Sequence, residues 1–355
     1  MKTDFFKDLK VIEIASVLAG PSVGLFFSEL GSSVIKVENK LTNGDVTRSW
    51  KLSSEDKNSN VSAYFCSVNW HKQYLFLDLT TEKDLETVKN LIVESDIVIL
   101  NFKKGDDLKF GLDYASLSKL NTQLIYGSIN GFGEKSDRVA YDLILQAESG
   151  FMSMNGTADS GPVKMPVALI DILAGHQLKE GILVALIERM KTNKGQKVSV
   201  SLYDSAVASL ANQATNWLMG NHIAKRIGST HPNIAPYGEL FTTKDNNLIT
   251  FAIGSNKQFT NLCSVLNLDS IIEDNRFSSN VSRVKNRISL ENLIKNEVIK
   301  WDSKSLIDCL HSKFVPVAKI NSINEVFKSQ SAKDLILTEQ IDGVETKRVK
   351  TIVFK

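Results

Sequence analysis

The sequence predicts an α/β fold in which a parallel sheet carries helices on both faces. The first half of the 355-residue chain alternates between short apolar runs, typical of buried strands, and segments with helical periodicity. Strands that alternate with helices predict crossover connections, and these give parallel sheets whose ligands bind beyond the carboxyl ends of the strands. At about 150 residues per domain, the length predicts two domains.

The predicted elements follow one another along the chain. Leu9 to Ala15 (LKVIEIA) is expected as a strand, and Pro21 and Gly31 fit the start and the end of the helix that follows. Further strands are expected at SVIKVE (33–38), FLDL (76–79), DIVILNF (96–102), TQLIYGSI (122–129) and QKVSVSL (196–202). Further helices are expected at 81–94, 114–120, 142–154 and 170–190.

The sequence pattern changes near residue 221, and Gly228, Pro232 and Pro236 mark a loop there. Several helical segments follow this loop. We therefore expect a smaller α+β domain at 216–319 and a large domain that comprises 1–215 and 320–355.

Composition excludes several classes of function. The formal net charge of +2 argues against a nucleic-acid partner. No stretch reaches the ~18 apolar residues of a membrane helix, and the start lacks an apolar signal core, so a cytoplasmic location without a membrane partner is expected. The cysteines (Cys66, Cys263 and Cys309) and the five histidines lack metal-site spacing, so no metal site is expected.

Familiar nucleotide and hydrolase motifs are absent from the sequence. It contains no GxGxxG after the first strand, no P-loop and no GxSxG, which argues against nicotinamide, nucleoside-triphosphate and serine-hydrolase chemistry. Gly20 and Pro21 precede a helix whose free N–H groups favour an anion, although a plain tight turn has the same pattern.

Basic residues gather near the predicted strand ends. If the sheet is doubly wound, they converge on one rim and suit a phosphate-rich ligand; the alternative is a scatter of solvated lysines. These residues are Lys36, Lys40, Lys72, Lys103, Lys104 and Lys109.

Asp171 lies in VALIDILAG, an apolar run that ordinarily contains no charge. A buried acid is costly unless it is paired or functional, which makes Asp171 a candidate catalytic residue. The structural alternative is a helix N-cap, because a long helix is expected to begin here.

Eight segments taken together resemble the family III CoA-transferases, the group that includes formyl-CoA transferase, carnitine CoA-transferase and the α-methylacyl-CoA racemases. The resemblance covers nearly the whole chain. In chain order the segments are LKVIEIASVLAGPSVGLFFSELGSSVIKVE, GDVTR, NWHKQYLFLDL, NFKKGDDLKFGLD, YDLILQAESGFMSMNG, PVALIDILAG, KGQKVSVSLYDSAV and HPNIAPYGEL.

The resemblance implies a Rossmann-like large domain built from both ends of the chain and two subunits interlinked as rings in a homodimer. It implies that Asp171 attacks the donor thioester and carries the CoA as a covalent intermediate, with CoA as a substrate and no tightly bound cofactor. The chemistry needs a carboxylate shielded from water and N–H donors for the oxyanion. The backbone near Gly20, or Gly131 and Gly133, fits the donor role.

The resemblance also implies the contacts of CoA and of the acceptor acid. The CoA contacts are Val17, Leu18, Ala19, Asn39, Leu77, Asn101, Phe102, Lys103, Lys109 and Tyr141. Asn39 and Lys109 stand where many members of the family have Arg, so CoA contacts are expected to shift to Lys36, Lys72, Lys103 or Lys104. His231 and Tyr237 are expected at the acceptor pocket, although turn structure alone also explains them.

Three functions stay open at this stage. A CoA-transferase between carboxylic acids leads, with small dicarboxylates, hydroxy acids and carnitine-like acids as possible substrates. An acyl-CoA racemase is disfavoured because Tyr141 stands where the racemases have the catalytic His, and a phenol is a poor base near neutral pH. A non-catalytic CoA-binding subunit is the third.

Overall fold

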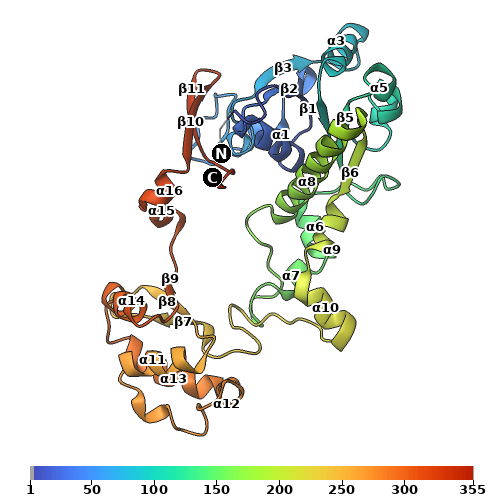
Figure 1. Cartoon of the computed structure of the whole chain (residues 1–355). Coiled ribbons are helices and arrows are strands. Elements are labelled where there is room, and N and C mark those ends of the chain that lie inside the picture. Colours follow the sequence, from blue (N-terminus) through green and yellow to red (C-terminus); the bar gives the residue numbers. More distant parts are fainter. Residues whose placement is uncertain (1–3, 355) are drawn as a thin grey trace. The chain divides into compact units, whose positions relative to one another are not determined.

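The computed structural model describes residues 4–354, which form two compact units. The first unit runs to Ser153, resumes over Val163–Ala224 and takes up the chain again from Asp334. The second comprises Met154–Pro162 and Lys225–Lys333. Both ends of the chain therefore belong to the first unit (Figure 1).

A six-stranded parallel sheet in the order β3-β2-β1-β4-β5-β6 forms the centre of the first unit. Its strands are β1 (Lys10–Ile14), β2 (Ser33–Asn39), β3 (Gln73–Leu77), β4 (Ile97–Leu100), β5 (Ile125–Asn130) and β6 (Lys197–Ser201). The strand order reverses between β1 and β4, and sheets of this kind bind ligands at such a switch point. The predicted α/β fold with a parallel sheet is confirmed.

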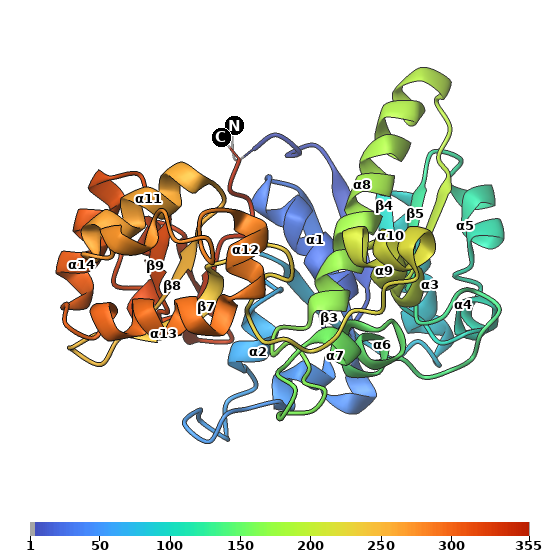
Figure 2. The ribbon, with the colours of Figure 1, turned by 90° about the horizontal axis from the view of Figure 1, so that it is seen from below.

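Helices cover both faces of this sheet (Figures 1 and 2). On one face α1 (Ala19–Glu29) and α8 (Leu169–Thr192) pack against each other, and on the other face α3 (Glu82–Val93) packs against α5 (Tyr114–Leu120). Strand alternation supplies both layers: Val11 of β1 packs in the core on the α1 and α8 side, whereas its neighbour Ile12 packs in the core on the α3 and α5 side.

Shorter elements make up the rest of the chain before residue 225. They are α2 (Ala63–Cys66), α4 (Asp106–Phe110), α6 (Asp142–Glu148), α7 (Phe151–Met154), α9 (Leu202–Ala208) and α10 (Ala211–Gly220), with 3-10 turns at Lys40–Thr42 and Val46–Ser49. The prediction of a single helix at 142–154 is wrong, because Gly150 adopts a φ of 90° and separates α6 from α7.

The C-terminal segment is anchored to the end of α1. It contains an antiparallel hairpin of β10 (Ile336–Ile341) and β11 (Val344–Val349). The Glu29 carboxylate accepts hydrogen bonds from the Arg348 guanidinium and from the backbone N–H groups of Thr351 and Ile352.

The second unit has its own apolar core and a three-stranded antiparallel sheet. The strands are β7 (Tyr237–Thr242), β8 (Leu248–Ala252) and β9 (Val317–Lys319). The helices are α11 (Asn256–Val265), α12 (Asn280–Lys285), α13 (Arg287–Val298), α14 (Ser303–Ser312), α15 (Ile323–Val326) and α16 (Gln330–Lys333), with a 3-10 turn at Asp269–Ile271.

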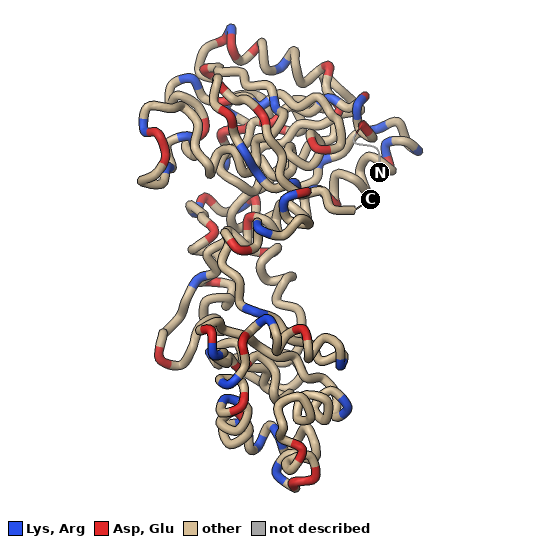
Figure 3. Tube along the Cα trace, turned by 90° about the vertical axis from the view of Figure 1, so that its left-hand side faces the viewer, with Lys and Arg blue, Asp and Glu red and all other residues tan. Residues whose placement is uncertain are grey.

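Charge is mixed along both units. Figure 3 shows Lys and Arg interspersed with Asp and Glu along the trace, in keeping with the net charge of +2. Among the helices of residues 4–354, none has the length and apolar content that a membrane span needs.

Candidate active site

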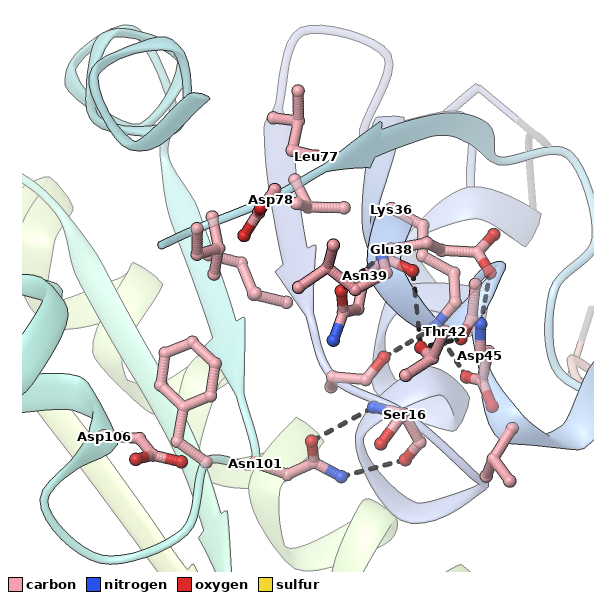
Figure 4. A pocket seen from close by; sticks show the side chains of 18 of the residues that line it. Ser16, Lys36, Glu38, Asn39, Thr42, Asp45, Leu77, Asp78, Asn101 and Asp106 are labelled. Carbon is pink, nitrogen blue, oxygen red and sulfur yellow. Dashed lines mark hydrogen bonds and ion pairs between the residues drawn. The ribbon is translucent and has the colours of Figure 1, made fainter. Parts of the chain in front are cut away.

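A cavity of about 430 Å³ opens beyond the carboxyl ends of β1 to β4, at the switch point of the sheet (Figure 4). Five of the CoA contacts that the resemblance implies line it: Asn39, Leu77, Asn101, Phe102 and Lys103. Lys36, expected to compensate for the missing arginines, lines it as well. The structure therefore brings together residues that lie more than sixty positions apart in the sequence, as the predicted topology requires.

Sequence reasoning missed further residues that line the same cavity, among them Thr42, Asp106 and Phe110. Thr42 lies in the 3-10 turn after β2, while Asp106 and Phe110 lie on α4. Their only signal in the sequence was their closeness to expected contacts. The Phe102 and Phe110 rings lie 6.0 Å apart between centroids, so the cavity offers aromatic surface beside polar groups, which suits a flat ring with polar substituents.

The other expected CoA contacts lie outside this lining. Val17, Leu18 and Ala19 form the turn from β1 into α1, and Val17 has a φ of 71°. Lys109 lies on the exposed side of α4, with its Nζ 5.1 Å from the centroid of the Phe110 ring. Tyr141 is 56% exposed at the N-cap of α6.

The interpretation of Lys36 and Lys72 as phosphate ligands is wrong. The Lys36 ammonium already contacts the carboxylates of Glu13 and Asp45 and the carbonyl oxygen of Ala15. The Lys72 ammonium contacts Glu13 Oε2 at 2.7 Å, and its other contacts are the Pro21 carbonyl and the Asn69 side chain. An ammonium has three donors, so neither lysine has one left for a phosphate.

Asp171 lies in the first turn of α8 and is only 7% exposed. Burial, and secondarily the charge of Asp142, raises the pKa of its carboxyl to about 7. Among residues 4–354 the carboxylate has neither a hydrogen-bond donor nor a cationic partner. A buried acid without a neutralising partner is typical of functional sites.

The N-cap alternative for Asp171 is wrong. Ala168 occupies the cap position of α8 and makes no side-chain cap bond. The acid that serves the helix start is Asp142, whose Oδ1 accepts a hydrogen bond of 2.7 Å from the N–H of Ile170. Asp171 therefore has no capping role that explains its burial.

The first turn of α1 packs closely against α8 one helical turn beyond Asp171. Gly175 follows Asp171 by one helical turn, and a Cβ at Gly175 would lie 2.3 Å from Ser22 Oγ and 3.2 Å from the Ala19 carbonyl oxygen. The positive ends of two helix dipoles thus lie near the carboxyl group, and they favour negative charge that develops there.

One of the two glycines of the expected oxyanion site at Gly131 and Gly133 is already engaged. The Gly133 N–H donates a 2.6 Å hydrogen bond to Asn130 Oδ1, so it has no free donor for a ligand. Ala19 and Gly20 lie in the first turn of α1, whose N–H groups have no acceptor inside the helix. The start of α1 is therefore the better candidate.

Tyr64 is a further residue of this region that sequence reasoning missed. Burial, followed by the charges of Asp171, Asp142 and Asp45, raises the pKa of its phenol to about 12. It lies on the four-residue helix α2, and no spacing in the sequence links it to Asp171. It remains protonated near neutral pH.

The expected acceptor residues lie in the second unit. The His231 ring packs on Tyr237 with 5.1 Å between ring centroids, and its Nδ1 accepts a hydrogen bond from the N–H of Asn233. This bond assigns the ring proton to Nε2, which is left as a donor. Arg287 holds the same loop through the carbonyl oxygens of His231 and Ile234.

Within the described part of the chain, no group of three His, Cys, Asp or Glu side chains is placed to hold a metal ion. The chemistry that the described side chains offer is that of a shielded carboxylate near free N–H donors, together with a separate cavity for a polar ligand.

Comparisons with known proteins point to one family. The family model of CoA-transferase family III matches residues 6–354. The chain is 40% identical over 325 residues to the succinate–glutarate CoA-transferase of Agrobacterium fabrum, covering 90% of this chain and 80% of that protein. It is 34% identical over 322 residues to the succinyl-CoA:glutarate CoA-transferase of Mus musculus, covering 90% and 72% of the two chains.

Solved structures agree on the fold. A CAIB/BAIF family protein from Brucella suis matches with a TM-score of 0.87 and 37% identity, covering all of this chain and 93% of that one. A Mycobacterium tuberculosis protein matches with a TM-score of 0.84 at 24% identity over 99% of this chain and 93% of that one, a likeness of fold alone.

Proposed function

The chain belongs to CoA-transferase family III, and from this premise we propose that it transfers CoA through covalent intermediates on Asp171. It is a transferase that moves CoA from an acyl-CoA to a carboxylic acid. The observation that carries the proposal about Asp171 is its burial without any neutralising partner among the described residues, in the turn where α8 meets α1.

The proposed reaction has four exchanges at the Asp171 carboxyl group. The carboxylate attacks the thioester carbonyl of the donor, the C–S bond breaks, and a mixed anhydride and CoA thiolate result. The thiolate then attacks the aspartyl carbonyl of the anhydride, which releases the donor acid and leaves an aspartyl-CoA thioester. The acceptor carboxylate attacks the aspartyl carbonyl of this thioester, the C–S bond breaks, and a second mixed anhydride and CoA thiolate result. The thiolate finally attacks the acceptor carbonyl of that anhydride, which forms the new CoA ester and releases the Asp171 carboxylate.

The surroundings of Asp171 suit these steps. A buried carboxylate is kept from water, which would hydrolyse an anhydride. The free N–H groups of Ala19 and Gly20 are proposed to stabilise the oxyanion of each tetrahedral intermediate. The pKa of about 7 makes a substantial fraction of Asp171 ionised, and therefore nucleophilic, at neutral pH.

We place the nucleotide end of CoA in the 430 Å³ cavity, against Asn39, Leu77, Asn101, Phe102 and Lys103. The turn of Val17, Leu18 and Ala19, together with Lys109 and Tyr141, completes the proposed contacts. This division assigns CoA binding to the first unit, which comprises both ends of the chain.

For the acids, we propose small dicarboxylates. The relatives from Agrobacterium fabrum and Mus musculus carry names that specify succinate and glutarate. In the second unit, His231 and Tyr237 are proposed to bind the acceptor, with the His231 Nε2–H as a donor to a carboxylate oxygen. We further propose that two copies of the chain interlink as a homodimer, which sedimentation and crosslinking test.

The proposal is tested by incubating the protein in heavy water with succinyl-CoA or glutaryl-CoA and a mixture of carboxylic acids, followed by mass spectrometry of the CoA esters. New esters that disappear in Asp171→Ala support transfer through this residue. Unchanged ester formation by Asp171→Ala contradicts the assignment.

The same samples separate the two alternatives. Deuterium at the α-carbon of a 2-methylacyl-CoA added to the same mixture, without new esters, identifies a racemase, the activity that Tyr141 argues against. CoA binding by calorimetry without either signal identifies a non-catalytic subunit.

A further inference from the structure

The turn between β1 and α1 is held by side chains at several of its backbone groups. Asn101 clamps Ser16 from both sides: its Oδ1 accepts from the Ser16 N–H at 3.0 Å, and its Nδ2 donates to the Ser16 carbonyl at 2.8 Å (Figure 4). The Val17 N–H points at both carboxylate oxygens of Asp45, at 3.3 and 3.2 Å. The turn is therefore fixed by residues far from it in the sequence.

Two lysines hold the two ends of the same turn. Lys36 Nζ donates to the Ala15 carbonyl at 2.5 Å, and Lys72 Nζ donates to the Pro21 carbonyl at 2.9 Å. Both ammonium groups share the carboxylate of Glu13, which is fully buried. We call Glu13, Lys36, Asp45 and Lys72 the buried ionic network.

Gly24 shows that α1 is shaped around this network. A Cβ at this position would lie 1.9 Å from Glu13 Oε2 and 3.5 Å from Lys72 Cε. The helix therefore approaches the Glu13–Lys72 pair so closely that no larger residue fits without displacing it.

The network holds Val17 in a conformation that valine resists. A φ of 71° is costly for a β-branched residue and persists only where the surroundings over-determine it. Such strain is concentrated at functional sites, and this turn leads directly to the free N–H groups of Ala19 and Gly20.

We propose that the buried ionic network is a positioning device, which holds residues 15–21 so that the first N–H groups of α1 face the reacting carbonyl beside Asp171. The proposal rests on the proposed function. Lys36 and Asp45 also line the cavity proposed for the nucleotide end of CoA, but their charged groups are engaged within the network, which acts on the reaction through the backbone of the turn. Asp45 is the critical member, because it joins Lys36 to the strained Val17.

Asp45→Asn is the sharpest test. The carboxylate serves the Val17 N–H, the Thr47 N–H and hydroxyl, and the Lys36 ammonium. The asparagine side chain has one oxygen where aspartate has two. Its NH2 group must therefore face either the Thr47 donors or the Lys36 ammonium, and it cannot accept a hydrogen bond from them. In either orientation the NH2 group also lies beside the Val17 N–H, which keeps a single acceptor, so the turn is held less tightly at positive φ.

The readout is the rate constant for formation of the enzyme–CoA thioester in the absence of acceptor, measured by quenched-flow mass spectrometry alongside the Kd for CoA. We expect Asp45→Asn to lower this rate constant by about 10- to 100-fold, the cost of a ~1 Å misplacement, with little change in Kd. In a Val17→Gly background the same substitution should cost much less, because glycine adopts φ near 71° without strain.

The matched control is Arg348→Met, which breaks another buried ion pair of the first unit, with Glu29. It should lower the Tm and leave the rate constant of folded enzyme unchanged. If Asp45→Asn does not fold, the comparison of Val17→Gly with the double variant carries the test.

Two results overturn the proposal. In the first, the rate constant falls no more in Asp45→Asn than in Arg348→Met. In the second, Asp45→Asn lowers the rate constant by the same factor in the wild-type and in the Val17→Gly background. If the wild-type protein forms no thioester with any acyl-CoA, the proposed function fails instead, which distinguishes the two.

Discussion

Glu13 and Asp171 are both buried carboxylates of the first unit, but their surroundings are opposite. Glu13 is fully buried and contacts two ammonium groups, those of Lys36 and Lys72. Asp171 is nearly as buried, has no cationic partner among the described residues, and has a second acid, Asp142, nearby. A neutralised carboxylate stabilises and positions, whereas one left without a partner is costly and reactive.

The largest expected effect is the loss of activity when Asp171, the carboxylate without a cationic partner, is replaced. Asp171→Asn removes the nucleophile and should lower transfer by roughly 10⁴-fold or more, as the loss of other covalent catalytic groups does. The rate of appearance of new CoA esters measures it.

Asp113→Asn is the matched control for this substitution. Asp113 is also a buried aspartate at a helix start, where its side chain caps α5, and asparagine caps equally well. It should transfer CoA at the wild-type rate. A similar loss in both variants would mean that the effect of Asp171→Asn is structural.

Neutralising substitutions at the two carboxylates should change the free energy of unfolding in opposite directions. Glu13→Gln leaves buried ammonium groups without their shared partner and should lower the free energy of unfolding by about 3–5 kcal/mol. Asp171→Asn should raise it at high pH, because the folded protein there must ionise a group that burial disfavours. Urea denaturation across a pH series measures both.

The pH dependence of the second effect follows from the direction of the shift. The folded pKa of Asp171, about 7, lies above its ordinary value of 3.8, so the folded protein binds more protons between these values and its stability falls as pH rises through this window. The gain in free energy of unfolding of Asp171→Asn over the wild-type protein should grow through the same window to at most about 4 kcal/mol. An advantage independent of pH would contradict the raised pKa.

A smaller effect is expected from the neighbouring acid. Asp142→Asn removes the charge that helps to raise the pKa of Asp171 and keeps an oxygen for the Ile170 N–H. The acid limb of the pH–rate profile should therefore move to lower pH, while the plateau rate stays within a few-fold. A limb that stays in place would show that burial alone sets this pKa.

The smallest effect is expected at an exposed charge of the cavity. Lys103→Ala removes an exposed lysine of the cavity lining and should raise the KM for acyl-CoA by about 3- to 5-fold, because exposed charge pairs contribute up to ~1 kcal/mol. Lys109→Ala is the comparison, since Lys109 lies outside the lining. A larger rise in KM in Lys109→Ala would indicate that the phosphates of CoA bind nearer to α4.

The sequence predicted the features that depend on local pattern. The apolar runs of β1, β2 and β4 gave the parallel sheet, and a single acid in VALIDILAG pointed to Asp171. Glu13 in LKVIEIA is the same signal, an acid in an apolar strand, yet its meaning differs because Lys36 and Lys72 reach it only in the folded chain.

The same limit explains the errors at the other positions. The two lysines were interpreted as ligands because their spacing placed them near strand ends, and spacing does not reveal which way a side chain points. Thr42, Asp106 and Tyr64 enter the site through short turns and helices that carry no periodicity.

The most direct test of the central claim is to incubate the protein with an acyl-CoA without acceptor and to map the covalent product. We expect a CoA thioester on the peptide that contains Asp171, which forms faster as pH rises through about 7, and which an added dicarboxylate discharges as a new CoA ester. Steady transfer without any adduct on this peptide, or an adduct on another residue, would contradict the account.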